Sequence, residues 1–191
     1  SHELRTPLTS IKGWSETLGL DNISKEELSM GLGIINDETE RLIKLVEELL
    51  DFSRMSSNRM KLNIAEVNIE NLVSSVINQL RSMAIKKNIR LSFEFLNQDM
   101  TIIYGDKDRL RQVLINLVQN SLKFTPEEGV ISVKVDQTSN ETSICVADNG
   151  IGIDEKNIAN VSKKFFQEDF HKSGSGLGLA ISEEIVKLHG G

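Results

Sequence analysis

Residues 106–129, DKDRLRQVLINLVQNSLKFTPEEG, contain the helix around which the second half of the chain is built. Asp106 is a common N-cap residue type, and a proline and a glycine close the segment, so the pattern predicts a helix from Asp106 to about Lys123. Steps of four and three residues place Asn116, Asn120 and Lys123 on one helical face. The amide oxygen of Asn120 suits Mg²⁺ and the Lys123 ammonium suits phosphate oxygens, although a polar helix face is also typical of simple solvent exposure.

The segments on either side of this helix alternate between strand and helix patterns. The predicted strands are 61–67, 89–96, 101–104, 130–137 and 143–147, and the further helices are 69–85 and 177–189. Pairs of strands with helices between them predict a two-layer α/β sandwich, in which the helices lie on one face of a mixed sheet.

A glycine-containing turn follows directly after the last predicted strand. It begins at Asp148 and includes Gly150 and Gly152. Glycine allows a tight turn and the close approach of a flat ligand, and the Asp148 carboxylate can accept a hydrogen bond. An ordinary surface turn is the alternative interpretation.

A second glycine cluster, consisting of Gly174, Gly176 and Gly178, opens the last predicted helix. Backbone without side chains at a helix N-terminus directs N–H groups at an anion, typically a phosphate. The cluster does not follow a strand immediately, and no Walker A sequence is present, so a nucleotide site here would be neither of the Rossmann type nor of the P-loop type.

The N-terminal part of the chain has only helical patterns. Residues 4–18 and 28–53 predict two helices, with Ser24 and Glu27 as a capping box before the second. The second helix carries a heptad seam. The seam consists of Leu28, Leu32, Ile35, Thr39, Leu42, Val46, Leu49 and Ser53. Further apolar residues widen this stripe, which a single hairpin cannot bury.

We therefore expect a homodimer in which the hairpins of two chains form a four-helix bundle through residues 4–53. Packing of the stripe on the second domain of the same chain is the alternative. The expected domains are a helical hairpin at 1–56, a linker at 57–60 and an α/β domain at 61–191, with C-terminal strands of the sheet absent from the sequence.

A histidine stands at the start of the first predicted helix. His2 lies beside the carboxylate of Glu3, with Thr6 one turn further along. Neutral imidazole is nucleophilic and titrates near neutral pH, so this pair suits nucleophilic chemistry. A solvated surface histidine is the alternative, and the choice depends on whether the rest of the chain can deliver an electrophile to His2.

Composition excludes several classes of protein. The net charge of −6 argues against nucleic-acid or anionic-membrane binding as the main task. Cys145 is the single cysteine and lies in an apolar run, so we expect it to be buried and the chain to suit a reducing cytoplasm. No apolar run reaches the roughly 18 residues that a transmembrane helix requires.

Together and in this order, the segments 116–123, 148–153 and 174–181 resemble the N, G1 and G2 boxes of the Bergerat-type ATP-binding domain. Histidine kinases, Hsp90-type chaperones, MutL and type II topoisomerases share that domain. Residues 2–7, HELRTP, resemble the H box of the sensor histidine kinases of two-component systems. Between the G1 and G2 boxes the chain departs from that family, with Ser162 and Gln167 where an aromatic residue and an arginine are usual.

The resemblance implies roles for the residues of the N and G1 boxes. Asn120 would coordinate the Mg²⁺ that bridges the phosphates of ATP, Asn116 would support it and Lys123 would contact phosphate. Phe124 stands where the family often has an aromatic residue against the base. Asp148 would accept a hydrogen bond from the adenine amino group.

The glycines acquire roles from the same resemblance. Gly150 belongs to the G1 turn, and Gly152 would lie close to the adenine ring. Gly174, Gly176 and Gly178 would bound the phosphates and form the hinge of a lid.

The resemblance also implies the reaction and the partners. His2 would attack the γ-phosphate while Glu3 holds or accepts the Nδ1 proton, and the phosphoryl group would then pass to an aspartate of a response regulator. Thr6 matches the position that orients water for dephosphorylation of the regulator. We expect the cytoplasmic part of a longer, membrane-anchored sensor, without direct membrane contact of its own. A related ATPase or chaperone, and a dimeric signalling module without activity, are the alternatives.

Overall fold

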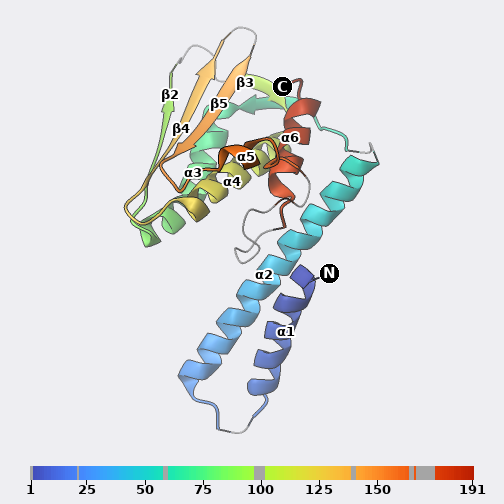
Figure 1. Ribbon diagram of the computed structural model, residues 1–191, viewed down its shortest axis with the longest axis vertical. Helices are drawn as coiled ribbons and strands as arrows, with labels where there is room; N and C mark the ends of the chain where they lie inside the picture. The colour runs from blue at the N-terminus through green and yellow to red at the C-terminus, as the bar shows by residue number, and fades with distance from the viewer. Residues whose placement is uncertain are drawn as a thin grey trace.

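The computed structural model describes residues 2–20, 22–57, 60–96, 102–138, 141–163, 166 and 175–191. For His2 and Glu3 it describes the backbone alone. The chain forms a helical hairpin followed by an α/β domain, as the sequence predicts (Figure 1).

The hairpin consists of α1 (His2–Thr17) and α2 (Lys25–Ser56), which lie side by side (Figure 1). The predicted capping box starts α2: the Glu27 N–H donates to Ser24 Oγ at 3.1 Å, and the Ser24 N–H donates to Glu27 Oε2 at 2.9 Å. Gly31 of α2 is buried against Trp14 and Leu18 of α1. The absence of a side chain at this position allows the two helices to approach closely.

The apolar stripe of α2 has two different environments. At the C-terminal end, Met55 is buried, and Phe52 packs in the same cluster with Leu177 and Ile181 of the second domain. Further back, most apolar side chains of the stripe stay exposed on the single chain, with Val46 at 47% and Leu32 at 54%. Packing on the second domain therefore accounts only for the end of the stripe, and the rest remains available to a partner.

The strands form a mixed arrangement. The antiparallel pair is β1 (Ala65–Asn68) with β3 (Ile102–Gly105), and the larger sheet has the order β2 (Arg90–Phe95), β4 (Val130–Gln137), β5 (Thr142–Asp148). Strand β2 is parallel to β4, whereas β5 is antiparallel to it. The predicted strand at 61–67 is shorter than expected, because only its end pairs with β3. The short helix α5 (Glu155–Ile158) was not predicted.

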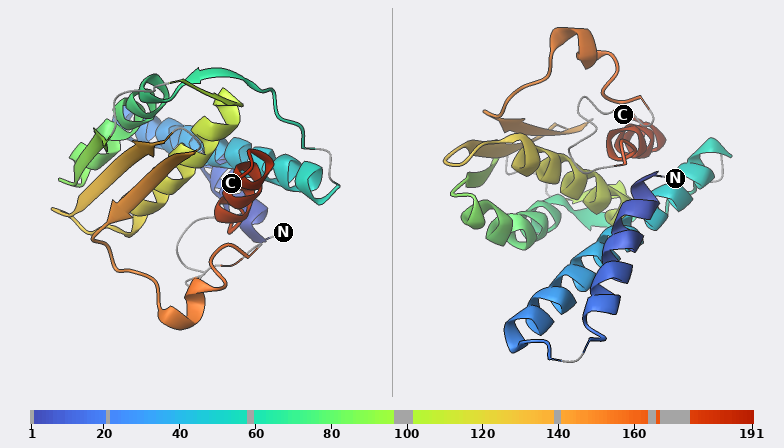
Figure 2. Two further views of the ribbon diagram at one scale, coloured as in Figure 1. Left: turned by 90° about the horizontal axis from the view of Figure 1, so that it is seen from above. Right: turned by 60° about the horizontal axis from the view of Figure 1, so that its bottom comes forward.

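The main core lies between the sheet and two helices, α3 (Ile69–Lys86) and α4 (Lys107–Phe124), which lie together on one side of the strands (Figure 2). Leu72, Leu80, Val118 and Ile131 are among the buried side chains there. The expectation for Cys145 was wrong. This residue is exposed, because β5 alternates and its neighbours Ile144 and Val146 supply the side chains that pack on the core.

Both termini of α4 are tied to other parts of the domain. At its start, the buried Asp106 caps the helix as predicted. Its carboxylate accepts hydrogen bonds from the N–H groups of Asn63 at 2.8 Å, Asp108 at 3.1 Å and Arg109 at 3.1 Å. The Asp106 N–H in turn donates to Nε2 of His189 at 2.9 Å, and His189 Nδ1 lies 2.7 Å from the Ile185 carbonyl oxygen. His189 thereby joins the end of α6 (Gly178–Leu188) to the start of α4.

We expect Gly31→Ala to destabilise the hairpin by about 1–3 kcal/mol. A Cβ at Gly31 would lie 2.7 Å from Trp14 Cε3 and 2.9 Å from Leu18 Cδ2, so the helices must move apart. Gly33→Ala is the matched control, because no atom lies within 4 Å of its added Cβ, and alanine favours a helix over glycine by about 1 kcal/mol. Urea unfolding followed by fluorescence of the single tryptophan would measure both changes. Equal effects of the two substitutions would contradict close packing at Gly31.

Asp106→Ala should destabilise the α/β domain by about 1–2 kcal/mol at neutral pH, because α4 loses its cap. Burial raises the pKa of Asp106, but the three N–H donors outweigh it and hold the pKa below its usual value. The stabilisation is therefore present above the ordinary carboxyl pKa and is lost as the pH falls through the lowered folded-state pKa. Unfolding at several pH values would test this. Asp106→Asn, which keeps an acceptor oxygen, should retain part of the stability without the acid dependence.

Candidate functional site

The end of β5 and the last turn of α4 meet at a carboxylate. Ser121 Oγ donates to Asp148 Oδ2 at 2.8 Å, and the Gly150 N–H donates to Asp148 Oδ1 at 2.9 Å. Ser121 is buried, whereas Asp148 is exposed to solvent. The predicted acceptor Asp148 is thus held by two donors and remains accessible to a ligand. Sequence reasoning missed Ser121, although it follows Asn120 directly in the predicted motif.

The G1 turn also packs on the C-terminal end of α4. The Ile151 N–H donates to the Phe124 carbonyl oxygen at 3.2 Å, and a Cβ at Gly150 would lie 2.6 Å from that same oxygen. Only glycine fits this approach. Gly152 has a φ of +71°, which favours glycine, and no atom lies within 4 Å of a Cβ built there. The predicted residues Phe124, Gly150 and Gly152 are therefore gathered at one edge of α4.

A lysine that the sequence did not single out completes this end of the helix. Lys87 Nζ donates to the carbonyl oxygens of Leu122 at 2.6 Å and Thr125 at 2.8 Å. A cation at a helix C-terminus satisfies free carbonyl groups and interacts favourably with the helix dipole. Lys123, in the same turn, places its Nζ 4.8 Å from the centre of the Phe124 ring.

The N and G2 boxes are in direct contact. Asn116 Nδ2 donates to Ser182 Oγ at 2.9 Å, and a Cβ at Gly178 would lie 2.3 Å from Asn116 Oδ1. Asn116 therefore supports the first turn of α6. This helix starts without a side-chain cap, and Gly176 just before it has a φ of +66°. Gly174 lies outside the described residues.

Asn120 is the residue that the sequence predicts to bind Mg²⁺. Its side chain is half-buried, and none of the described residues forms a side-chain hydrogen bond with its amide. The described part of the chain also contains no group of three His, Cys, Asp or Glu residues that could hold a metal. Mg²⁺ commonly takes few protein ligands and completes its shell with water and substrate phosphates, so a single amide oxygen fits this ion.

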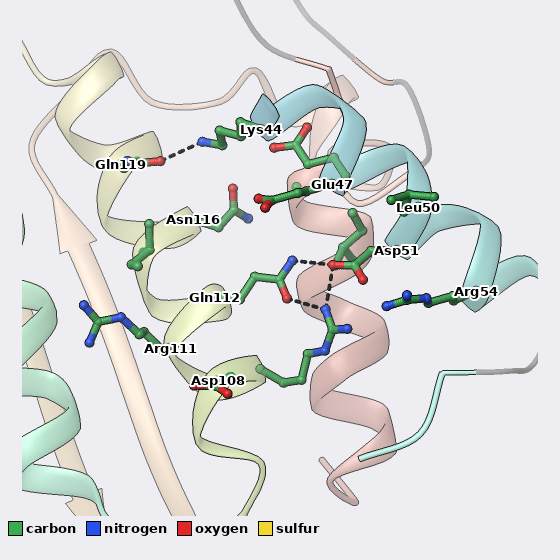
Figure 3. Close-up of a pocket in the computed structure, with 15 residues that line it drawn as sticks. Lys44, Glu47, Leu50, Asp51, Arg54, Asp108, Arg111, Gln112, Asn116 and Gln119 are labelled. Carbon is green, nitrogen blue, oxygen red and sulfur yellow. Dashed lines mark hydrogen bonds and ion pairs between the residues drawn. The ribbon is translucent and has the colours of Figure 1, made fainter. Parts of the chain in front are cut away.

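Helix α2 contacts α4 across a cavity of about 450 Å³ (Figure 3). Asp51, which is buried, accepts hydrogen bonds through Oδ2 from Arg109 Nη1 at 2.6 Å and from Gln112 Nε2 at 2.8 Å. Lys44 Nζ donates to Gln119 Oε1 at 2.8 Å (Figure 3). These contacts between residues far apart in the sequence were not predicted.

The same cavity adjoins the predicted nucleotide site. Asn116 and Gly178 are among the residues that line it. The hydroxyl group of Ser175 donates to a carboxylate oxygen of Glu48 on α2, and the Leu177 N–H donates to Ser175 Oγ at 3.1 Å. Helix α2 therefore touches the segment that leads into the first turn of α6.

The N-terminal motif lies on the first turns of α1. Thr6 is exposed, and the side chains of His2 and Glu3 lie outside what the structure describes. All three views place the start of α1 near α6 (Figures 1 and 2). The helix that carries His2 thus begins on the side of the molecule where α6 lies.

Two family models match the chain. Residues 1–58 match the His Kinase A (phospho-acceptor) domain, and residues 105–191 match the histidine kinase-, DNA gyrase B-, and HSP90-like ATPase. The chain belongs to the sensor histidine kinases of two-component systems, and the family predicted from the sequence is confirmed. Within the described residues, no helix combines the length and the apolar character needed to cross a bilayer.

The similarity to relatives of known sequence or structure extends over nearly the whole chain. The circadian input-output histidine kinase CikA of Synechococcus elongatus is 34% identical over 199 residues, which cover 100% of this chain and 26% of CikA. Full-length ShkA in complex with AMPPNP has a TM-score of 0.76 at 30% identity, covering 99% of this chain and 40% of ShkA. ThkA in complex with the response regulator protein TrrA has a TM-score of 0.71 at 30% identity, covering 96% of this chain and 51% of that chain.

Gly178→Ala should weaken ATP binding about tenfold, which corresponds to roughly 1.4 kcal/mol. The added Cβ would clash with Asn116 Oδ1 and push the first turn of α6 out of place. Calorimetry with ATP and Mg²⁺ would measure the loss. In the Asn116→Ala background the clash is absent, so adding Gly178→Ala should cost little further affinity. An equal loss in both backgrounds would show that contact with Asn116 is not the cause.

Proposed function

We propose that this chain is the catalytic part of a protein-histidine kinase, which binds ATP with Mg²⁺ and transfers the γ-phosphoryl group to His2. The observation that carries the proposal is the arrangement around α4. This helix contacts Asp148 and Gly150 on one side, and Gly178 and Ser182 on the other. In this proposal the turn at Asp148 binds the base and the N-terminus of α6 binds the phosphates, and the AMPPNP complex of ShkA supports ATP as the nucleotide.

The proposed adenine site lies at the end of β5. The exposed carboxylate of Asp148 accepts a hydrogen bond from the amino group of adenine. Gly150 and Gly152 keep side chains away from the ring, and the Phe124 ring supplies an apolar surface for the base. A guanine base would place a carbonyl oxygen against Asp148, so the site favours adenine.

The proposed triphosphate site lies between α4 and α6. The N–H groups at the start of α6, with Gly174, Gly176 and Gly178, would donate hydrogen bonds to the phosphate oxygens, and Lys123 would add a positive charge. Asn120 would hold Mg²⁺, which supplies charge neutralisation at the phosphate oxygens when bound. No carboxylate cluster among the described residues competes for the ion.

The proposed chemistry takes place at the start of α1. Nε2 of neutral His2 attacks the γ-phosphorus, the bond to the bridging oxygen breaks, and ADP leaves. Glu3 holds the Nδ1 proton during attack and can accept it as positive charge develops on the ring. The protein contributes chiefly by positioning the reactants and neutralising charge.

Two partners follow from this proposal. A second copy of the chain would cover the exposed stripe of α2, and the two hairpins would together form a four-helix bundle. A response regulator would receive the phosphoryl group on an aspartate, as the complex of ThkA with TrrA supports. Thr6 would orient water for the reverse reaction, dephosphorylation of the regulator. Because the reaction uses ATP, we place this part of the protein in the cytoplasm.

Incubation with γ-labelled ATP and Mg²⁺ should label the protein at a site that is labile in acid and stable in alkali, as phosphohistidine is. His2→Gln should abolish the label while leaving ATP binding intact, because the substitution lies outside the nucleotide site. Asn120→Ala should lose both. Label on serine or threonine would contradict the proposal, and full biological activity of His2→Gln would favour an ATPase or chaperone instead.

Two measurements test the dimer: sedimentation of the chain, and mixing of the two inactive variants. Sedimentation should show a species twice the mass of the chain at micromolar concentration. If transfer occurs between subunits, mixed His2→Gln and Asn120→Ala chains should recover labelling. A monomer at all concentrations would contradict the proposed bundle.

A further inference from the structure

Ser121 occupies an unusual position for a small polar residue. It lies in the last turn of α4, only 6% exposed, and its hydroxyl group reaches the end of β5 and donates to Asp148 Oδ2 at 2.8 Å. A buried serine in a helix often returns its proton to a backbone carbonyl in the preceding turn. Here the proton goes instead to a carboxylate that is exposed to solvent.

This hydrogen bond restricts the orientation of the Asp148 carboxylate. An exposed aspartate can rotate between staggered side-chain conformations. The Gly150 N–H, at 2.9 Å from Oδ1, comes from the neighbouring turn of the same segment and moves with it. Ser121 is on a different element, α4, so its hydroxyl group fixes the carboxylate relative to the helix that carries Asn120 and Lys123.

We propose that Ser121 is a positioning residue for adenine recognition, which orients the Asp148 carboxylate so that it accepts a hydrogen bond from the 6-amino group. The inference rests on the proposed function, in which Asp148 meets the base. A carboxylate oxygen accepts more than one hydrogen bond. The two bonds from Ser121 and Gly150 therefore leave acceptor capacity for the ligand while removing the freedom to turn away from it.

The role differs from simple support of the fold. Alanine is a better helix former than serine, and removing the hydroxyl group leaves Asp148 exposed to water, so Ser121→Ala should fold normally. What changes is the cost of orienting the carboxylate when the ligand binds. That cost falls only on nucleotides whose base uses Asp148.

The experiment compares two nucleotides by calorimetry with Mg²⁺: ATP, and purine riboside triphosphate, which lacks the 6-amino group. Ser121→Ala should weaken ATP binding about two- to tenfold, the value of one hydrogen bond, and should leave purine riboside triphosphate unchanged. Ser75→Ala is the matched control. Its hydroxyl group bonds Arg111 and the Leu72 carbonyl oxygen on the α3 side of α4, away from Asp148, so it should change neither affinity.

The outcomes separate the inference from the proposed function. If the natural chain binds both nucleotides equally, the role of Asp148 in base binding is wrong, and the inference fails with it. If the natural chain prefers ATP and Ser121→Ala keeps the whole preference, the proposed function stands and the role of Ser121 is wrong. An equal loss for both nucleotides also overturns it, because that result indicates a structural role.

A second variant and a second readout use the same logic. Ser121→Cys keeps a side chain of similar shape with a weaker donor, so its preference for ATP should lie between those of serine and alanine. In autophosphorylation, Ser121→Ala should raise the KM for ATP and leave kcat unchanged, because the hydroxyl group acts on the base and not on the phosphates. A loss of kcat at saturating ATP would contradict the proposal.

Discussion

The hydrogen bonding at the two ends of α4 is the constraint on which the candidate site depends. Asp106 satisfies the N–H groups at one end, and Lys87 satisfies carbonyl groups at the other. Asn116, Asn120 and Ser121 lie between these ends, so their positions follow from where the helix starts and stops. Because the same helix also contributes buried side chains to the core beside α3, the site is built on an element of the core.

Two glycines allow the other elements to reach α4. At Gly150 the approaching atom is the Phe124 carbonyl oxygen, and at Gly178 it is the amide oxygen of Asn116. In both places a methyl group would occupy the space that a hydrogen-bonded contact needs. Gly150 of the G1 turn and Gly178 of α6 therefore serve packing, and both lie against the same helix from different directions.

Local patterns allowed most of the fold to be predicted, because caps and periodicity depend on neighbouring residues. The start of α4 at Asp106 and the capping box at Ser24 are examples. Contacts between distant residues could not be predicted in this way. Lys87 and Ser121 act on groups 35 and 27 residues away in the sequence, and no spacing rule links them. Cys145 was misplaced because its apolar neighbours hid the alternation of the strand.

The contact between Asp51 and α4 has a mechanical consequence. One carboxylate oxygen holds Arg109 and Gln112, which are three residues apart and so stand on adjacent turns of the same face. With two anchors on one face, α4 cannot turn about its own axis relative to α2 without breaking a hydrogen bond. The Asp51 carboxylate therefore ties the orientation of the hairpin to that of the helix that carries Asn116 and Asn120.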